Sequence, residues 1–181
     1  MTRTGGYSII ELVVTLVVMG IVASIAIPGF SRWLPDYRLK TATTELYSNL
    51  QLAKMYAVRD NIEWALKFNT VLQAYQIRKA KGPDGKYIDD PVTGFDVEKT
   101  ILLQNYKGGV GYGHGTATGD LGGGWDDEVT FGVNTVVFSP RGMADHEGYV
   151  YLQNNKNVTY AVGSLTTGLI LMRKWTGTAW E

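Results

Sequence analysis

The chain has 181 residues, of which 45% are hydrophobic and 19% charged, a mixture typical of a folded globular protein rather than a disordered one. Its 17 basic and 17 acidic side chains cancel, so no overall charge attracts nucleic acid or an anionic surface. The chain has no cysteine, which excludes disulfides and every site that depends on a thiol.

The first element along the chain is an apolar stretch from Tyr7 to Phe30 that contains one charged residue, Glu11. A bilayer core takes about 20 helical residues, so the stretch is long enough to cross one. Arg3 precedes it and weakly favours a cytoplasmic N-terminus. A carboxylate at membrane depth costs roughly 2.5–3.5 kcal/mol on insertion scales, so Glu11 indicates a function.

Three interpretations compete for this stretch. A secretory signal cleaved after Ala26 has a suitable small residue there, but its apolar region would be unusually long and would contain Glu11. A plain membrane anchor explains the length but neither Glu11 nor the Gly5-Gly6 pair. In the third interpretation a peptidase cuts after Gly6, where no side chain obstructs it, and frees an amine on Tyr7.

The third interpretation gives Glu11 a role in assembly. Glu11 follows Tyr7 by four residues, or one helical turn. In a bundle of such helices, the Glu11 carboxylate of one copy can pair with the Tyr7 ammonium of a neighbour. Burial makes this pairing selective, because a carboxylate left unpaired in the bundle loses its solvation without compensation.

These residues form a longer pattern, Gly6-Tyr7-Ser8-Ile9-Ile10-Glu11-Leu12, followed downstream by Ala26-Ile27-Pro28. The pattern resembles the class III signal of type IV pilins and type II secretion pseudopilins, with Tyr7 at a position where that family usually has Phe. The resemblance implies cleavage after Gly6 by prepilin peptidase and N-methylation of Tyr7. It also implies assembly with other pilins or pseudopilins by a platform in the bacterial inner membrane.

The same resemblance implies a layout for the chain. Residues 1–6 are a prepilin leader, residues 7–30 a transmembrane and filament-core helix, and residues 31–181 a periplasmic α+β domain. The subunit is expected first in the inner membrane, crossing it once, and then in a filament. Pro28 predicts a kink or a loosened turn in the helix, because proline lacks the amide hydrogen. A plain helix end near the membrane boundary is the alternative, which Pro35 supports.

From Asp36 to about Asn61 the pattern is again helical, and it resembles the soluble half of a long pilin helix. Its apolar residues recur every three or four positions and form one face: Leu39, Ala42, Leu46, Leu50, Ala53 and Ala57. The polar side chains expected away from that face are Lys40, Glu45, Asn49, Lys54 and Arg59.

The remainder of the chain has the pattern of strands separated by turn residues. The predicted strands are 62–69 and 72–79, which form a hairpin, and 100–106, 128–131, 135–138, 148–152, 158–162 and 169–175. The glycine-rich segment 107–124 is expected to be a mobile surface loop. The predicted fold is therefore α+β, with a long helix against antiparallel sheets.

The C-terminal strands carry a second resemblance. The residues are Val136-Val137-Phe138-Ser139-Pro140-Arg141-Gly142, Gly148–Leu152, Tyr160–Val162 and Thr167–Ile170. They resemble the C-terminal half of the GspH/FimT minor pilin family. This implies a structural subunit and not an enzyme: a minor pilin or pseudopilin of a type II secretion pseudopilus or a type IV pilus, with a major filament subunit as an alternative.

DNA binding is a further alternative. Some FimT-like pilins resemble DNA receptors and carry a Gly-Arg-x-Arg strand, but both arginines are missing from the matching residues here, Gly168–Leu171. Arg173 and Lys174 follow closely, and Trp175 and Trp180 could stack on bases. Loss of the leader leaves 16 basic side chains, since Arg3 is one of the 17, against 17 acidic ones, so nucleic acid is disfavoured as a partner.

Metal and cofactor chemistry has little support. Two acidic groups contain the oxygen ligands that calcium prefers: Asp84, Asp89, Asp90, Asp96 and Glu98, and then Asp120, Asp126, Asp127 and Glu128. Neither has EF-hand spacing, so solvated acidic loops are the favoured interpretation and calcium a minor alternative. No phosphate-binding loop or nucleophile motif occurs. We expect no cofactor, no metal and no catalytic residue.

Overall fold

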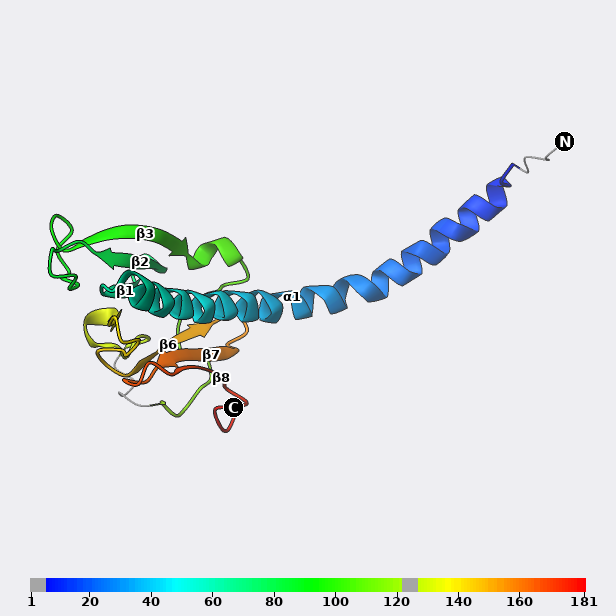
Figure 1. Cartoon of the computed structure of the whole chain (residues 1–181). Helices are drawn as coiled ribbons and strands as arrows, with labels where there is room; N and C mark the ends of the chain where they lie inside the picture. Colours follow the sequence, from blue (N-terminus) through cyan, green and yellow to red (C-terminus); the bar gives the residue numbers. More distant parts are fainter. Residues whose placement is uncertain (1–5, 122–126) are drawn as a thin grey trace. The chain divides into compact units, whose positions relative to one another are not determined.

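The computed structural model describes residues 6–121 and 127–181, which form two compact units that meet between Leu34 and Pro35. One helix, α1 (Ile9–Asp60), supplies all the regular structure of the first unit and the opening helix of the second (Figure 1). Pro28 and Pro35 both lie inside this helix, so the predicted alternative of a helix end there is wrong. Each proline removes one backbone hydrogen bond, and the neighbouring turns keep theirs.

The second unit contains two four-stranded sheets whose paired strands are all antiparallel. The first sheet has the order β3-β2-β1-β5, formed by β1 (Trp64–Asn69), β2 (Ala74–Ala80), β3 (Phe95–Leu102) and β5 (Thr135–Phe138). The second has the order β4-β6-β7-β8, formed by β4 (Gly111–Tyr112), β6 (Gly148–Gln153), β7 (Thr159–Ser164) and β8 (Ile170–Lys174). Two short 3-10 helices, η1 (Leu103–Tyr106) and η2 (Gly132–Asn134), lie between strands.

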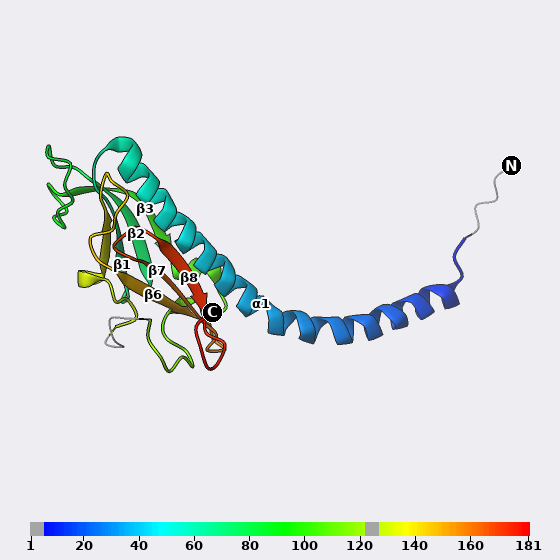
Figure 2. The ribbon, with the colours of Figure 1, turned by 60° about the horizontal axis from the view of Figure 1, so that its bottom comes forward.

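The core of the second unit lies between α1 and both sheets (Figure 2). All six residues of the predicted apolar face are buried, each at most 1% exposed: Leu39, Ala42, Leu46, Leu50, Ala53 and Ala57. They pack with side chains from both sheets, such as Phe68, Tyr75, Val150 and Leu152. The predicted α+β fold, a long helix against antiparallel sheets, is therefore confirmed.

Asn49 departs from the predicted pattern, because it is buried rather than turned away from the core. Its Nδ2 atom donates a hydrogen bond of 2.8 Å to the Tyr75 hydroxyl. A buried amide is tolerated when it has such a partner, and here the partner comes from a strand 26 residues later in the chain.

Two predicted strands differ in the structure. The strand expected at 100–106 begins earlier, at Phe95, and its last residues, 103–106, form η1 instead. The strand expected at 128–131 is reduced to one bridge, between Val129 and Val150. In both cases pairing with a distant strand, β2 or β6, decides how far the extended structure runs.

The glycine-rich segment was expected to be mobile, and its described part, up to Leu121, is instead anchored to the second sheet. It includes β4, and it is held by hydrogen bonds from outside the segment. These are Gln153 Oε1 accepting from Gly115 N at 2.7 Å, Thr159 Oγ1 donating to His114 O at 2.7 Å, Tyr151 Oη accepting from Leu121 N at 3.0 Å and Trp180 Nε1 donating to Gly119 O at 2.6 Å. Residues 122–124 of the predicted loop lie outside the described residues.

The anchored segment helps to cover the sheet face that carries Tyr149, Tyr151 and Ala161. These three buried residues form a second, smaller apolar cluster, against which Leu121, Leu171 and Trp180 pack. The end of the chain contributes a tight turn in which Trp175 and Trp180 pair across it, with ring centroids 5.3 Å apart. The aromatic pair holds Trp180 where its indole reaches the glycine-rich segment.

Candidate assembly site

The start of α1 places the predicted assembly carboxylate in the first helical turn. Ser8 precedes the helix, and its carbonyl accepts hydrogen bonds of 3.1 Å from the amides of Glu11 and Leu12. A helix N-terminus presents unpaired N–H groups and a positive dipole end, which favour an acidic side chain. Ser8 and Glu11 also have the Ser-x-x-Glu spacing of a capping box, a local sequence signal for a helix that starts here.

The predicted cleavage bond lies just before this helix, between two exposed residues. Tyr7 is 84% exposed, and a side chain at Gly6 would meet nothing within 4 Å. Both residues lack regular secondary structure, as the backbone of a protease substrate requires. The rest of the predicted leader, residues 1–5, lies outside the described residues. Pro28, the other predicted assembly residue, lies in the last quarter of the apolar stretch, within α1.

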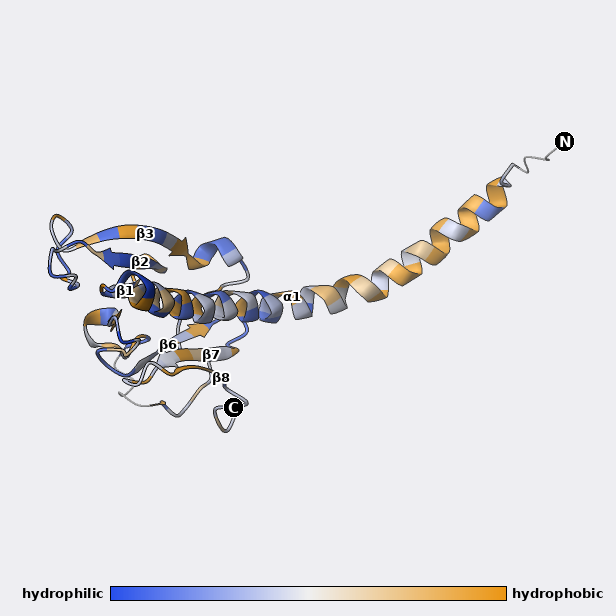
Figure 3. Ribbon diagram, in the orientation of Figure 1, coloured by the Kyte–Doolittle hydropathy of each residue, from blue (hydrophilic) through white to orange (hydrophobic). Residues whose placement is uncertain are grey.

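The first unit has an apolar surface that nothing in the unit covers. Every large apolar side chain from Ile9 to Phe30 is at least half exposed. Figure 3 colours most of the ribbon in this part of α1 as hydrophobic. By length and composition the helix can cross a membrane. Burying one such side chain is worth about 1.5–3 kcal/mol, so lipid or neighbouring helices are strongly favoured over water.

The predicted DNA-contacting residues do not form one surface. Arg173 and Lys174 are neighbours on β8, so their side chains point to opposite faces of the sheet. Lys174 Nζ lies 5.9 Å from the centroid of the Tyr160 ring. Trp175 is buried, and Trp180 packs against it and donates its N–H to Gly119. The structure therefore does not bring two cations and two free ring faces together.

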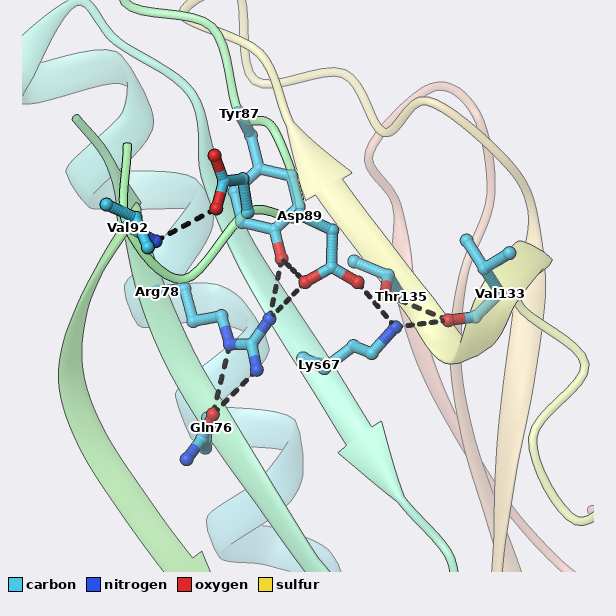
Figure 4. A network of polar contacts seen from close by, with 9 residues as sticks. Lys67, Gln76, Arg78, Tyr87, Asp89, Val92, Val133 and Thr135 are labelled. Atoms are coloured by element: carbon cyan, nitrogen blue, oxygen red, sulfur yellow. Dashed lines mark hydrogen bonds and ion pairs between the residues drawn. The ribbon is translucent and has the colours of Figure 1, made fainter. Parts of the chain in front are cut away.

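Carboxylates of the first acidic group form ion pairs with basic residues. Asp89 binds Lys67 at 2.8 Å and Arg78 at 2.6 Å (Figure 4). Partial burial raises the pKa of Asp89, but the hydrogen bonds and charges of Lys67 and Arg78 outweigh this and leave that pKa below its usual value. Lys67 also donates to the carbonyl of Val133, a β-branched residue in the left-handed conformation with φ of 46°.

Two further carboxylates of this group also have protein partners. Asp90 accepts from Val92 N and Thr93 Oγ1, and Asp96 lies 3.4 Å from Lys81 Nζ. In the second acidic group, Asp126 lies outside the described residues. Among residues 6–121 and 127–181, no three His, Asp or Glu side chains gather into a group that could hold a metal ion.

The two turns of the C-terminal resemblance meet on α1. Gly142, after β5, and Gly168, before β8, both have positive φ, of 75° and 77°. A Cβ atom on Gly168 would lie 1.9 Å from the Gly142 carbonyl oxygen. Lys54 Nζ donates a hydrogen bond of 2.9 Å to the Gly168 carbonyl. The contact between these turns, which lie 26 residues apart, leaves no room for a side chain at Gly168, while Gly142 is favoured by its positive φ.

The fold is similar to that of a solved type IV minor pilin. The type IV minor pilin FimU of Pseudomonas aeruginosa is 12% identical to this chain, with a TM-score of 0.53. The alignment covers 81% of this chain and 94% of the FimU chain. The minor pseudopilin EpsH from the Type 2 Secretion System of Vibrio cholerae is 12% identical to this chain, with a TM-score of 0.49. The alignment covers 75% of this chain and 95% of the EpsH chain. No curated protein sequence matched the chain.

A family model, Type II transport protein GspH, matches residues 42–168, which is well over half of the chain. The match covers the helix face from Ala42 onward, both sheets as far as β7, and the two turns that meet on Lys54. The predicted resemblance to this family is confirmed. The chain therefore belongs to the GspH family of type IV pilin-like proteins, whose members are structural subunits and not enzymes.

Proposed function

We propose that this chain is a minor pseudopilin or minor pilin, stored in the bacterial inner membrane and then assembled into a filament with other subunits. The observation that carries the proposal is the uncovered apolar surface of α1 from Ile9 to Phe30. The matched family model describes a type II transport protein, which favours a secretion pseudopilus over a pilus. In the proposed orientation residues 31–181 lie in the periplasm.

Maturation begins at the exposed bond between Gly6 and Tyr7. Prepilin peptidase cleaves this bond and the new N-terminal amine of Tyr7 is methylated. Three features support this step: Gly6 has no side chain, Tyr7 is exposed, and both precede the first helical residue, Ile9. An inner-membrane platform then moves the mature subunit from lipid into the filament.

Assembly uses the charge pair that cleavage creates. The Glu11 carboxylate of one subunit pairs with the Tyr7 ammonium of its neighbour, in surroundings made apolar by Ile9, Ile10 and Leu12. Before assembly the same carboxylate is favoured by the N-terminus of its own helix. The neighbour's ammonium replaces water as the partner, so an incoming subunit in the wrong register leaves two charges uncompensated.

The mature N-terminus tests maturation directly. Mass spectrometry of the chain isolated from cells that have a prepilin peptidase should show N-methylated Tyr7 as the first residue. An N-terminus at Ile27 would instead identify an ordinary secretory signal and contradict the proposal.

A charge-removing substitution tests the assembly step. Glu11→Gln keeps the size of the side chain but cannot form the ion pair, so incorporation into filaments should fall at least about tenfold, while membrane insertion stays intact. Thr15→Ala, one helical turn further along, removes a polar group that bonds only its own helix and should assemble normally. Normal assembly of Glu11→Gln would disprove the pairing and leave the family assignment untouched.

A further inference from the structure

Three cationic residues lie on adjoining segments at the end of the second unit where Pro35 lies. They come from separate segments: Arg38 from α1, Lys107 from the turn after η1, and Lys156 from the turn between β6 and β7. A Cβ atom on Gly108 would lie 3.4 Å from Pro35 Cα and 3.5 Å from Arg38 Cδ, so the Lys107 turn lies directly against the helix.

The two turns also contact each other. The amide of Asn155 donates a hydrogen bond of 3.2 Å to the Gly108 carbonyl, which places Lys107 and Lys156 on adjoining segments. Asn154 Nδ2 donates to Asp36 at 2.8 Å and so ties the second turn to α1 as well. The cations are therefore presented by a fixed surface and not by independent loops.

This surface has an excess of positive charge. Asp36 Oδ2 lies 3.4 Å from Lys156 Nζ, and Asp36 together with Arg38, Lys107 and Lys156 amounts to one negative and three positive charges on these adjoining segments. The remainder of the chain must be net negative, because the whole chain is neutral. Tyr37, which is 52% exposed, adds an aromatic side chain of the kind enriched at membrane interfaces.

The position of these residues in the chain specifies the partner. Pro35 follows Phe30, the last residue of the apolar stretch, by five positions. Even a fully extended chain of that length reaches only about 17 Å, which is about two Debye lengths at physiological salt. A subunit anchored through its apolar stretch therefore keeps this end close to the lipid surface.

We propose that Arg38, Lys107 and Lys156 bind the phosphates of anionic lipid headgroups while the subunit is stored in the membrane. The proposal rests on the membrane anchoring in the proposed function, and it adds a lipid contact that holds the folded domain against the bilayer before assembly. Arginine and lysine donate several N–H groups and no acceptor, which suits a surface of phosphate oxygens.

Hydrogen exchange of the full chain in lipid nanodiscs tests the contact. One set of discs contains phosphatidylcholine alone, and the other contains about one third phosphatidylglycerol, which supplies the negative headgroups. Amides of residues 104–110 and 153–158 should exchange at least about threefold more slowly in the anionic discs. About 0.5 M salt should abolish the difference, because it reduces the screening length to about 4 Å.

Two double variants with the same change of charge test whether the slower exchange depends on this surface or on the overall charge of the protein. The double substitution Lys107→Glu and Lys156→Glu should remove the lipid-dependent difference. The matched control, Lys81→Glu and Lys86→Glu, changes the same charge in the loop beyond the far end of α1 and should keep it. Near-ultraviolet circular dichroism of each variant shows whether it still folds.

Each outcome of these experiments bears on the lipid contact, on the membrane anchoring or on both. Insertion into both kinds of disc with equal exchange contradicts the lipid contact and leaves the anchoring intact. Equal slowing in both kinds of disc also contradicts it, because the contact would not depend on headgroup charge. If exchange slows only when a subunit with an acidic surface is present, and not with anionic lipid, the surface binds protein and the lipid contact is contradicted. Failure to insert at all would contradict the anchoring and this contact together.

Discussion

Single residues fix how the C-terminal half of the domain meets the helix, and Gly168 is the clearest of them. Its φ of 77° and its approach to the Gly142 carbonyl leave no room for a side chain. Its own carbonyl accepts the hydrogen bond from Lys54, which joins β8 to α1. A substitution here strains the backbone and displaces the neighbouring turn at the same time.

Gly168→Ala should therefore destabilise the folded domain by at least about 2 kcal/mol, from the backbone strain and the clash together. Gly119→Ala is a suitable comparison, because a Cβ atom there meets nothing within 4 Å, and it should change stability by less than about 1 kcal/mol. Urea denaturation followed by tryptophan fluorescence measures both. Equal midpoints for the two variants would show that the turn relaxes around the extra methyl group.

At the scale of elements, the loop of residues 81–94 is held by ion pairs and hydrogen bonds in addition to the stacking of Tyr87 on Phe95. Asp89 pairs with Lys67 of β1 and Arg78 of β2, and Glu63 accepts a hydrogen bond from Tyr87 N at 2.8 Å. The exposed fraction of the Asp89 side chain is 43%, so solvent screens the pairs. They contribute about 0.5–1 kcal/mol to closing the loop.

The pKa of Asp89 gives this loop a pH dependence. A carboxylate whose pKa is lower in the folded protein than in the unfolded one stabilises the fold above the unfolded value, and it loses that contribution as the pH falls through the folded value. Hydrogen exchange of residues 86–92, corrected for the intrinsic rate, should therefore quicken as the pH drops below about 4, near the ordinary pKa of aspartate. The loop of the Asp89→Asn variant should exchange fast at every pH. If exchange instead quickens with falling pH to the same extent in the variant and the wild-type protein, a group other than Asp89 causes the pH dependence.

For the whole molecule, the division at Leu34–Pro35 separates a part that needs a partner from a part that has its own core. The main apolar core runs from Leu39 to Ile170 and lies wholly in the second unit. The first unit buries none of its apolar window. The apolar surface that lipid or neighbouring helices would cover therefore belongs to the first unit.

Residues 35–181 expressed alone should accordingly be soluble and monomeric and should unfold in one cooperative transition. Leu46→Ala, which removes a fully buried side chain, should lower the free energy of unfolding by about 2–5 kcal/mol. Size-exclusion chromatography and thermal denaturation check both statements. A fragment that aggregates or melts without cooperativity would show that the apolar helix also supports the fold of the domain.

The sequence by itself determined the features that depend on local pattern. The apolar stretch with Glu11, the buried face from Leu39 to Ala57, and most strands follow from hydrophobic period and turn residues, which short segments contain in full. The family resemblance rested on the same local patterns. The candidate assembly residues were found for the same reason, since leader, carboxylate and apolar helix are contiguous.

The tertiary structure alone decided the features whose partners are distant in the chain. Asn49 is buried because Tyr75 accepts its hydrogen bond, and the glycine-rich segment is anchored because Gln153, Tyr151 and Trp180 reach it. The three segments that carry the cations near Pro35 adjoin one another for the same reason. Burial and hydrogen bonding depend on which segments pack together, and the local pattern of residues does not contain that information.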